Sequence, residues 1–207
     1  MLEAVIHGIV LAFGLILPLG VQNIFVFSQG ATQPTFLRVL PVVVTAAICD
    51  TILILLAVLG VSFILLSLPW LTSIVFGAGL LFLVYMGLVI WRSKPTAITE
   101  EKNVMSPKKQ VLFAASVSLL NPHAILDTIG VIGTNSLNYI GDEKIAFTFA
   151  TIIISWLWFL GLAITGRVVG KIDQNGTLQT MINKISALLI WGVAIYMGIQ
   201  LYDMLTV

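Results

Sequence analysis

Long runs of the sequence contain no charged side chain and no histidine. Among them are residues 51–91, 145–166 and 185–202. A helix that crosses a bilayer needs about 20 consecutive apolar residues, so each run is close to or above that length, and the first could cross twice. The whole chain is 59% hydrophobic and only 9% charged, which leaves too few polar residues for the outer shell of a soluble domain. These patterns predict an all-α polytopic membrane protein.

The apolar runs and the residues that interrupt them predict six transmembrane helices. The expected spans are 4–27, 39–66, 70–92, 110–134, 145–166 and 184–205. A hydrophilic loop, 93–109, divides the chain into a first repeat, 1–92, and a second, 110–207. We expect one transporter domain over 1–207. Residues 1–30 do not read as a cleaved signal, because Glu3 lies where such a segment is basic.

The basic residues indicate how the helices are oriented. With the N-terminus outside, nine of the ten Lys and Arg residues fall in loops on the cytoplasmic side, and only Lys144 falls on the external side. Cytoplasmic loops of membrane proteins carry an excess of Lys and Arg. We therefore expect both termini to be external in a multi-pass protein of the cell membrane.

The two halves of the chain carry matching residues. A proline followed five residues later by an amide or an acid occurs as Pro18 with Asn23 and again, 104 positions on, as Pro122 with Asp127. Tyr-Met-Gly occurs at 85–87 and again, 111 positions on, at 196–198. A repeat with an odd number of spans inserts its second copy upside down. The matches therefore predict a 3+3 inverted repeat with a pseudo-two-fold axis in the membrane plane.

Helix breakers lie inside the first and fourth expected spans. Pro18 and Gly20 interrupt the first span and Pro122 the fourth, where Asn121 precedes the proline and is biased away from helical geometry. Plain kinks are the alternative interpretation, since proline is frequent in membrane helices. Broken helices expose backbone groups that can bind a substrate. The pair Gly166 and Gly170 is expected at packing or turn positions.

Two carboxylates lie well away from the ends of expected spans, Asp50 in the second and Asp127 in the fourth. A charged side chain at the centre of a membrane helix costs about 2.5–3.5 kcal/mol on insertion scales, so such residues usually serve a function. A structural hydrogen bond to a neighbouring helix is the alternative for each acid. His123 could carry a proton or only make a structural hydrogen bond. The amides that accompany these residues, equally candidates for hydrogen bonds between helices, are Gln22, Asn23 and Asn121.

Motifs for other functions are missing from the sequence. A single cysteine, Cys49, rules out an internal disulfide or a cysteine-pair oxidoreductase. The chain has no zinc-protease, serine-hydrolase or nucleotide-binding motif. We expect a protein that is not an enzyme, has no cofactor or metal, and binds no nucleic acid.

Two segments resemble signatures of the lysine/arginine exporter family, the LysE type. Residues 15–30 look like its first-span signature and residues 119–128 like its fourth, while the second-span acid corresponds to Asp50. The resemblance covers essentially the whole chain and implies amino-acid export, which places the protein in the bacterial inner membrane. The acid at Asp127 favours the branch that exports basic amino acids. Alternatives are an exporter of neutral amino acids such as homoserine, threonine or leucine and, behind it, an inorganic cation exporter.

On this resemblance, Asp127 and Asp50 would bind the cationic groups of lysine or arginine and exchange them for protons, with His123 as a further proton carrier. The α-carboxylate and α-amine would lie against the broken backbone and the amides Gln22, Asn23 and Asn121. Exchange of substrate and proton on one carboxylate is an antiport mechanism, and rocking of the two repeats would expose the site to either side. Substrate, protons and the lipid bilayer are the expected partners, and a homodimer is left open.

Overall fold

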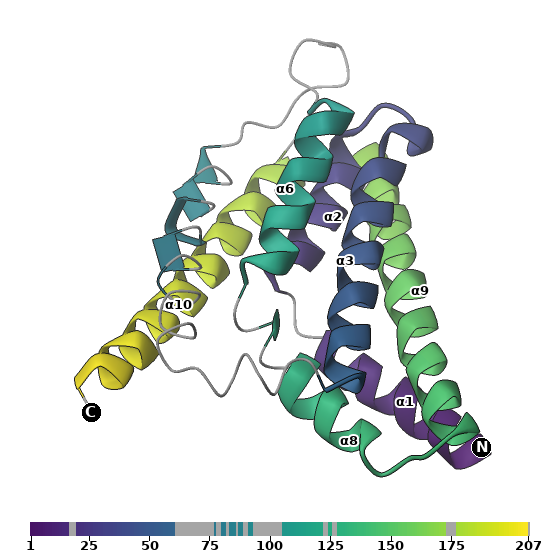
Figure 1. Cartoon of the computed structure of the whole chain (residues 1–207). Helices are drawn as coiled ribbons and strands as arrows, with labels where there is room; N and C mark the ends of the chain where they lie inside the picture. Colours follow the sequence, from purple (N-terminus) through teal and green to yellow (C-terminus); the bar gives the residue numbers. More distant parts are fainter. Residues whose placement is uncertain are drawn as a thin grey trace.

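The computed structural model is entirely helical in the part of the chain that it describes (Figure 1). The described residues are 1–16, 20–60, 77, 80–81, 83–85, 87–88, 91–92, 105–121, 124–125, 128–172 and 177–206. The elements are α1 (Leu2–Ile16), α2 (Val21–Thr32), η1 (Phe36–Arg38), α3 (Leu40–Val58), α6 (Pro107–Leu119), η3 (Thr128–Gly133), α8 (Thr134–Ser136), α9 (Asp142–Ile172) and α10 (Thr177–Thr206). The expected all-α class is confirmed for these residues.

Two helices are long and apolar enough to cross a membrane by themselves, α3 and α9. The bent pair α1 and α2 adds a third span if the two halves are taken together. This number applies only to the described residues, so the six-span arrangement stays a prediction. The helices α9 and α10 extend beyond the expected spans 145–166 and 184–205 because backbone hydrogen bonding continues through flanking polar residues.

Helices end on both sides of the two expected breaks. The axes of α1 and α2 differ by 80°, and Gly20 is the N-cap of α2 with extended backbone geometry. In the second half α6 ends at Leu119, three residues before the proline, as expected from the conformational restriction that proline imposes on the preceding residue. The chain then forms the π-helix η3 and the short helix α8.

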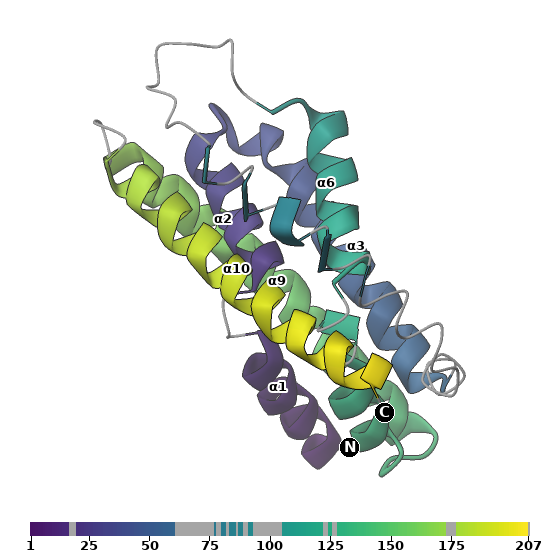
Figure 2. The same cartoon turned by 90° about the vertical axis from the view of Figure 1, so that its left-hand side faces the viewer.

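The long helices α3 and α9 lie side by side and run in opposite directions on the right-hand side of the molecule in Figure 1. Helix α9 also packs against α1 and α2, whereas α3 packs against α6 and η3. The short helices on either side of each expected break therefore pack on the long helix, α9 or α3, of the other half of the chain. Helix α10 crosses the face turned toward the viewer in Figure 2 and contacts α2.

Small residues bring α2 and α9 into close contact. A Cβ atom added at Gly30 would collide with the backbone of Ala163, and one at Gly166 with the carbonyl oxygen of Phe27. A Cβ atom at Gly170 would meet the carbonyl oxygen of Ala31 in the same way. Such close backbone approach is how small residues stabilise helix pairs in membranes. The expectation that Gly166 and Gly170 are packing positions is confirmed.

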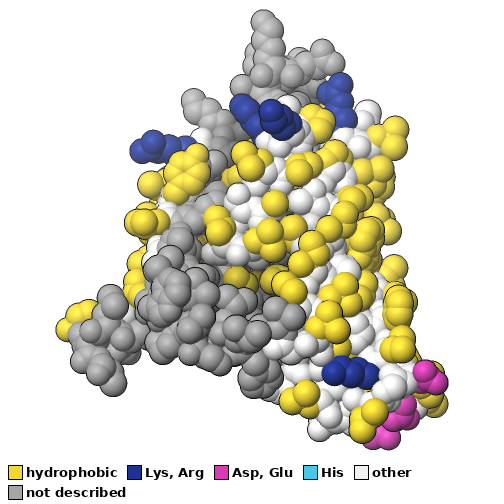
Figure 3. Space-filling view, in the orientation of Figure 1, with side chains coloured by type: hydrophobic (Ala, Val, Ile, Leu, Met, Phe, Trp, Pro, Cys, Tyr) yellow, Lys and Arg dark blue, Asp and Glu magenta, His cyan; other side chains and the backbone are white. Residues whose placement is uncertain are grey.

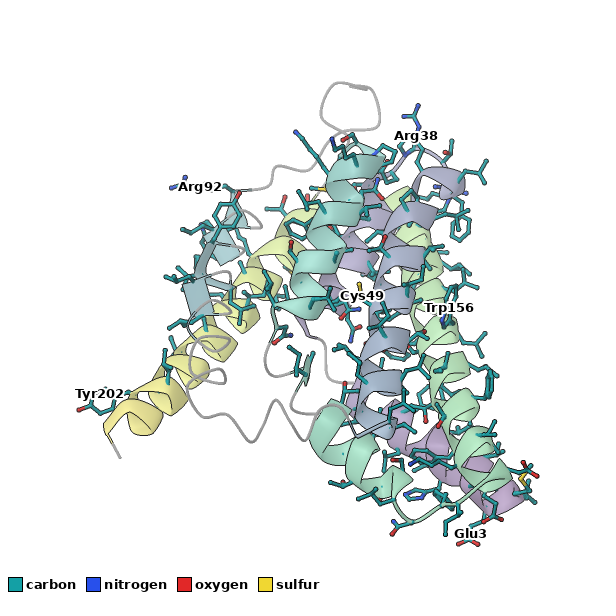
Figure 4. The ribbon with its side chains drawn as sticks, in the orientation of Figure 1. Glu3, Arg38, Cys49, Arg92, Trp156 and Tyr202 are labelled. Carbon is teal, nitrogen blue, oxygen red and sulfur yellow. The ribbon has the colours of Figure 1, made fainter. Side chains whose placement is uncertain are left out.

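Charged side chains gather at the two ends of the molecule, with hydrophobic and uncharged side chains between them (Figure 3). Arg38 and Arg92 lie toward one end and Glu3 toward the other (Figure 4). The N-terminus and Tyr202, near the C-terminus, lie away from the Arg38 end. This separation of charge by an apolar band is the pattern expected of helices that cross a bilayer.

Candidate functional site

Asp50 is the eleventh of the 19 residues of α3, about 15 Å from the start of the helix at about 1.5 Å per residue. Its side chain is partly buried and accepts a hydrogen bond from Ser155 on α9, with 2.5 Å between Ser155 Oγ and Asp50 Oδ2. Ser155 itself is fully buried. The acid is thus held at the contact between the two long helices.

A second hydrogen bond joins the same helices at the next residue of each. Trp156 Nε1 donates to Thr51 Oγ1 over 3.0 Å, and Thr51 Oγ1 donates to the carbonyl oxygen of Ala47 over 2.7 Å. Figure 4 labels Trp156 on α9 and Cys49 on α3, both at middle height of the molecule. The two bonds fix the register of α3 against α9 around Asp50.

The amides at the start of α2 lie next to this contact. Gln22 is buried, and its Nε2 lies 3.4 Å from the carbonyl oxygen of Ala46, which is one helical turn before Asp50. Asn23 is also buried, and its Nδ2 donates to the carbonyl oxygen of Ile16 over 2.8 Å. That carbonyl is among the last four of α1, which have no partner within their own helix. Asn23 therefore bridges the break in the first expected span.

The described residues of the predicted site lie on or next to three helices. Gln22 of α2 contacts α3 one helical turn before Asp50, whereas Asn23 bonds to the end of α1. Asn121 is partly buried just after the end of α6. The other site residues of the sequence prediction lie outside the described residues: Pro18, Pro122, His123 and Asp127. Their part of the site stays a prediction.

Asp50 has no basic partner among the described residues. The salt bridge that these residues form joins the Met1 amino group to Glu143 at the end of the molecule that carries Glu3. Within the same residues no group of three or more His, Cys, Asp or Glu side chains is placed to hold a metal ion. The site therefore offers a carboxylate, a hydroxyl and two amides as its polar side chains.

A buried glutamine cluster, Gln29, Gln33 and Gln110, lies at the end of the molecule that carries Arg38. Gln33 Nε2 donates to Gln29 Oε1 and to the carbonyl oxygen of Met105, each over 3.0 Å. Gln110 Nε2 donates to the carbonyl oxygens of Arg38 and Met105, also over 3.0 Å. The cluster attaches the start of α6 to the ends of α2 and η1. No sequence pattern predicts this cluster, because Gln110 lies far along the chain from Gln29 and Gln33 and the three residues belong to no motif.

Comparison with known proteins identifies the family. The family model described as LysE type translocator matches residues 13–201. The chain belongs to this family. Family membership together with the apolar helices α3 and α9 makes it a multi-pass membrane transport protein. The resemblance inferred from residues 15–30 and 119–128 is confirmed.

Curated relatives cover nearly the whole chain. A Bacillus subtilis (strain 168) protein named "Putative amino-acid transporter YisU" is 56% identical over 201 residues, which are 97% of this chain and 91% of that protein. The arginine exporter protein ArgO of Escherichia coli (strain K12) is 30% identical over 196 residues, 93% of this chain and 92% of ArgO. ArgO of Klebsiella pneumoniae (strain 342) is 31% identical over 195 residues, 91% of this chain and 90% of that protein. No solved structure matches the chain.

Proposed function

We propose that this protein exports a basic amino acid, arginine or lysine, in exchange for protons. The observation that carries the proposal is Asp50, a carboxylate halfway along a membrane helix that has a hydroxyl partner but no basic partner among the described residues. A carboxylate in a low-dielectric site is neutralised either by a proton or by a bound cation. The relatives named arginine exporter support a cationic amino acid as that cation.

The start of α2 supplies the complementary half of the site. Backbone N–H groups of the first helical turn have no partner within their helix and carry a partial positive charge. Gln22 lies beside Ala46, so this turn is about one helical turn from Asp50 along α3. The substrate α-carboxylate would bind at the start of α2 and its cationic group at Asp50, an arrangement found at broken helices of other transporters.

The proposal also includes the second acid, Asp127, and the inverted repeat. Asp127, with His123 beside the expected break at Pro122, would provide the corresponding site in the second repeat. Two features of the described residues support a 3+3 inverted repeat: α1 and α6 end at corresponding places, and each packs against the long helix of the other repeat. The same arrangement places both termini outside the cell and the Arg38 end of the molecule in the cytoplasm.

The experiment compares Asp50→Asn with Asp142→Asn. Asp142 is exposed at the start of α9, so its variant loses the same charge outside the site. In proteoliposomes loaded with radiolabelled arginine or lysine, we expect Asp50→Asn to lose efflux and Asp142→Asn to keep it. Wild-type efflux from Asp50→Asn would overturn the site. Efflux of threonine or leucine in place of the basic amino acids would show a neutral amino-acid exporter.

Proton exchange has its own measurement. Export of a cation against an inside-negative potential costs about 2.3 kcal/mol per charge for each 100 mV, so the cycle needs an energy source. With the voltage clamped, an acidic exterior should accelerate efflux of the labelled amino acid. Efflux that does not respond to external pH would show a uniporter or a channel.

A further inference from the structure

The hydroxyl of Ser155 behaves differently from other hydroxyls of the described helices. Side-chain hydroxyls in membrane helices usually donate to the backbone carbonyl one turn earlier in their own helix. Several described residues follow this rule: Thr45, Thr51, Ser118, Thr148, Thr151 and Thr165. Ser155 instead donates across the helix contact to Asp50 Oδ2. Its hydrogen bond therefore fixes the position of the carboxylate.

The positions of Asp50 and Ser155 match each other in the two proposed repeats. They are 105 positions apart, and so are Thr51 and Trp156, which form the neighbouring hydrogen bond. The two prolines are 104 positions apart and the Tyr-Met-Gly motifs 111, and the separation of 105 lies between these two values. The spacing is therefore compatible with Ser155 as the counterpart of Asp50 in the proposed second repeat.

Corresponding residues can touch only where the pseudo-two-fold axis passes between them. The antiparallel helices α3 and α9 meet this condition at Asp50 and Ser155. A second pair supports the same axis: Leu83 and Ala194 are 111 positions apart, and both are buried in one hydrophobic cluster. An axis in the membrane plane places the acid between the two sides of the membrane, where a site open alternately to each side must lie.

We propose that Ser155 is a positioning residue of the substrate site, which holds the Asp50 carboxylate from the corresponding position of the second repeat. This inference rests on the proposed function, since it assigns Ser155 to the acid that would bind the cationic group. The duplicated position has diverged: one copy carries the carboxylate and the other carries the hydroxyl that orients it. The pair therefore binds one cationic group, and the pseudo-symmetry does not double the site at this point.

The test separates orientation of Asp50 from helix packing. Ser155→Ala removes the hydrogen bond, Ser155→Thr keeps a hydroxyl, and Thr151→Val is the matched control. Thr151 is fully buried one turn earlier on α9, and its hydroxyl donates to its own helix at Phe147. A hydrogen bond to a charged group contributes about 1.5–3 kcal/mol, so we expect Ser155→Ala to raise the KM for arginine or lysine efflux about tenfold or more.

Ser155→Thr and Thr151→Val should keep a KM within about twofold of the wild type, with all variants present in the membrane in equal amount. A wild-type KM in Ser155→Ala would overturn the positioning role, and so would an equal rise in Thr151→Val. If Ser155→Ala matches the wild type while Asp50→Asn loses efflux, only this inference fails. If Asp50→Asn also keeps efflux, the proposed function fails.

An exchange of the two residues tests the axis. Asp50→Ser alone removes the acid, and Ser155→Asp alone places two acids together, so we expect both single variants to lose efflux. The double variant restores one acid and one hydroxyl across the same contact, and we expect it to regain measurable efflux. Absence of any recovery in a double variant that reaches the membrane would overturn the placement of the pair on the axis.

Discussion

The half-helix that follows the break packs differently in the two halves of the chain. In the first half α2 is a regular α-helix of 12 residues, and glycines let its backbone approach that of α9. In the second half the corresponding segment consists of the π-helix η3, which packs against α3, and the three-residue helix α8, which contacts η3 and α9. There a Cβ atom added at Gly133 would lie 3.2 Å from the carbonyl oxygen of Ala57, which is a tight but adjustable contact.

From this difference we expect the two halves of the chain to differ in how readily they change conformation. A helix in glycine-mediated backbone contact resists separation, because packed interiors tolerate small displacements poorly. A π-helix has weaker hydrogen-bond geometry and is found frequently at functional sites. We therefore expect α2 to stay fixed to α9, and the segment around η3, beside the expected second acid, to change conformation more readily.

The largest loss of stability is expected when a side chain is added at the close contact between α2 and α9. In Gly166→Ala the new methyl group meets the backbone carbonyl of Phe27, which cannot move without shifting α2. We expect a loss of roughly 1–3 kcal/mol of stability, measured as a lower midpoint of thermal unfolding in detergent. Gly161→Ala is the control on the same helix, since nothing lies within 4 Å of its added Cβ atom. Equal stability of the two variants would contradict the tight packing of α2 on α9.

A smaller effect on stability is expected at the glutamine cluster, which attaches the start of α6 to the ends of α2 and η1. Gln110→Met keeps much of the side-chain volume but removes the donor to the carbonyl oxygens of Arg38 and Met105. Leaving buried polar groups without a partner costs about 1–3 kcal/mol, though Met105 keeps its hydrogen bond from Gln33. We expect a loss near the lower end of that range in the same unfolding measurement. No loss would show that the glutamine cluster does not hold α6 in place.

The smallest effect on stability is expected in the second half. In Gly133→Ala the neighbour at Ala57 has to move by only a few tenths of an ångström, so the loss of stability should be smaller than that of Gly166→Ala. The control is Gly130→Ala in the same π-helix, whose added Cβ atom has nothing within 4 Å. A Gly133→Ala variant as unstable as Gly166→Ala would remove the difference between the two interfaces.

Sequence patterns predicted the helical class, the ends of α1 and α6 beside the two prolines, and the family, and they placed Asp50 inside a long apolar helix. These depend on local signals, namely charge-free runs, prolines inside them and short motifs. The role of Ser155 was not predictable, because a serine in an apolar helix usually bonds to its own backbone and only the placement of α9 against α3 reveals another partner. Gln33 and Gln110 were missed for a related reason, since they meet only through the carbonyl oxygen of Met105.

The contact between α2 and α9 has a consequence for how the protein can move. Helix α2 lies in the first half of the chain and α9 in the second, yet their backbones are in close contact. Helix α6 of the second half packs in turn on α3 of the first. If α2 moves with α9 and α6 with α3 during transport, each moving unit contains helices from both halves of the chain. We then expect one hinge between α2 and α3 and another between α6 and α9, so the moving units would not coincide with the two halves of the sequence.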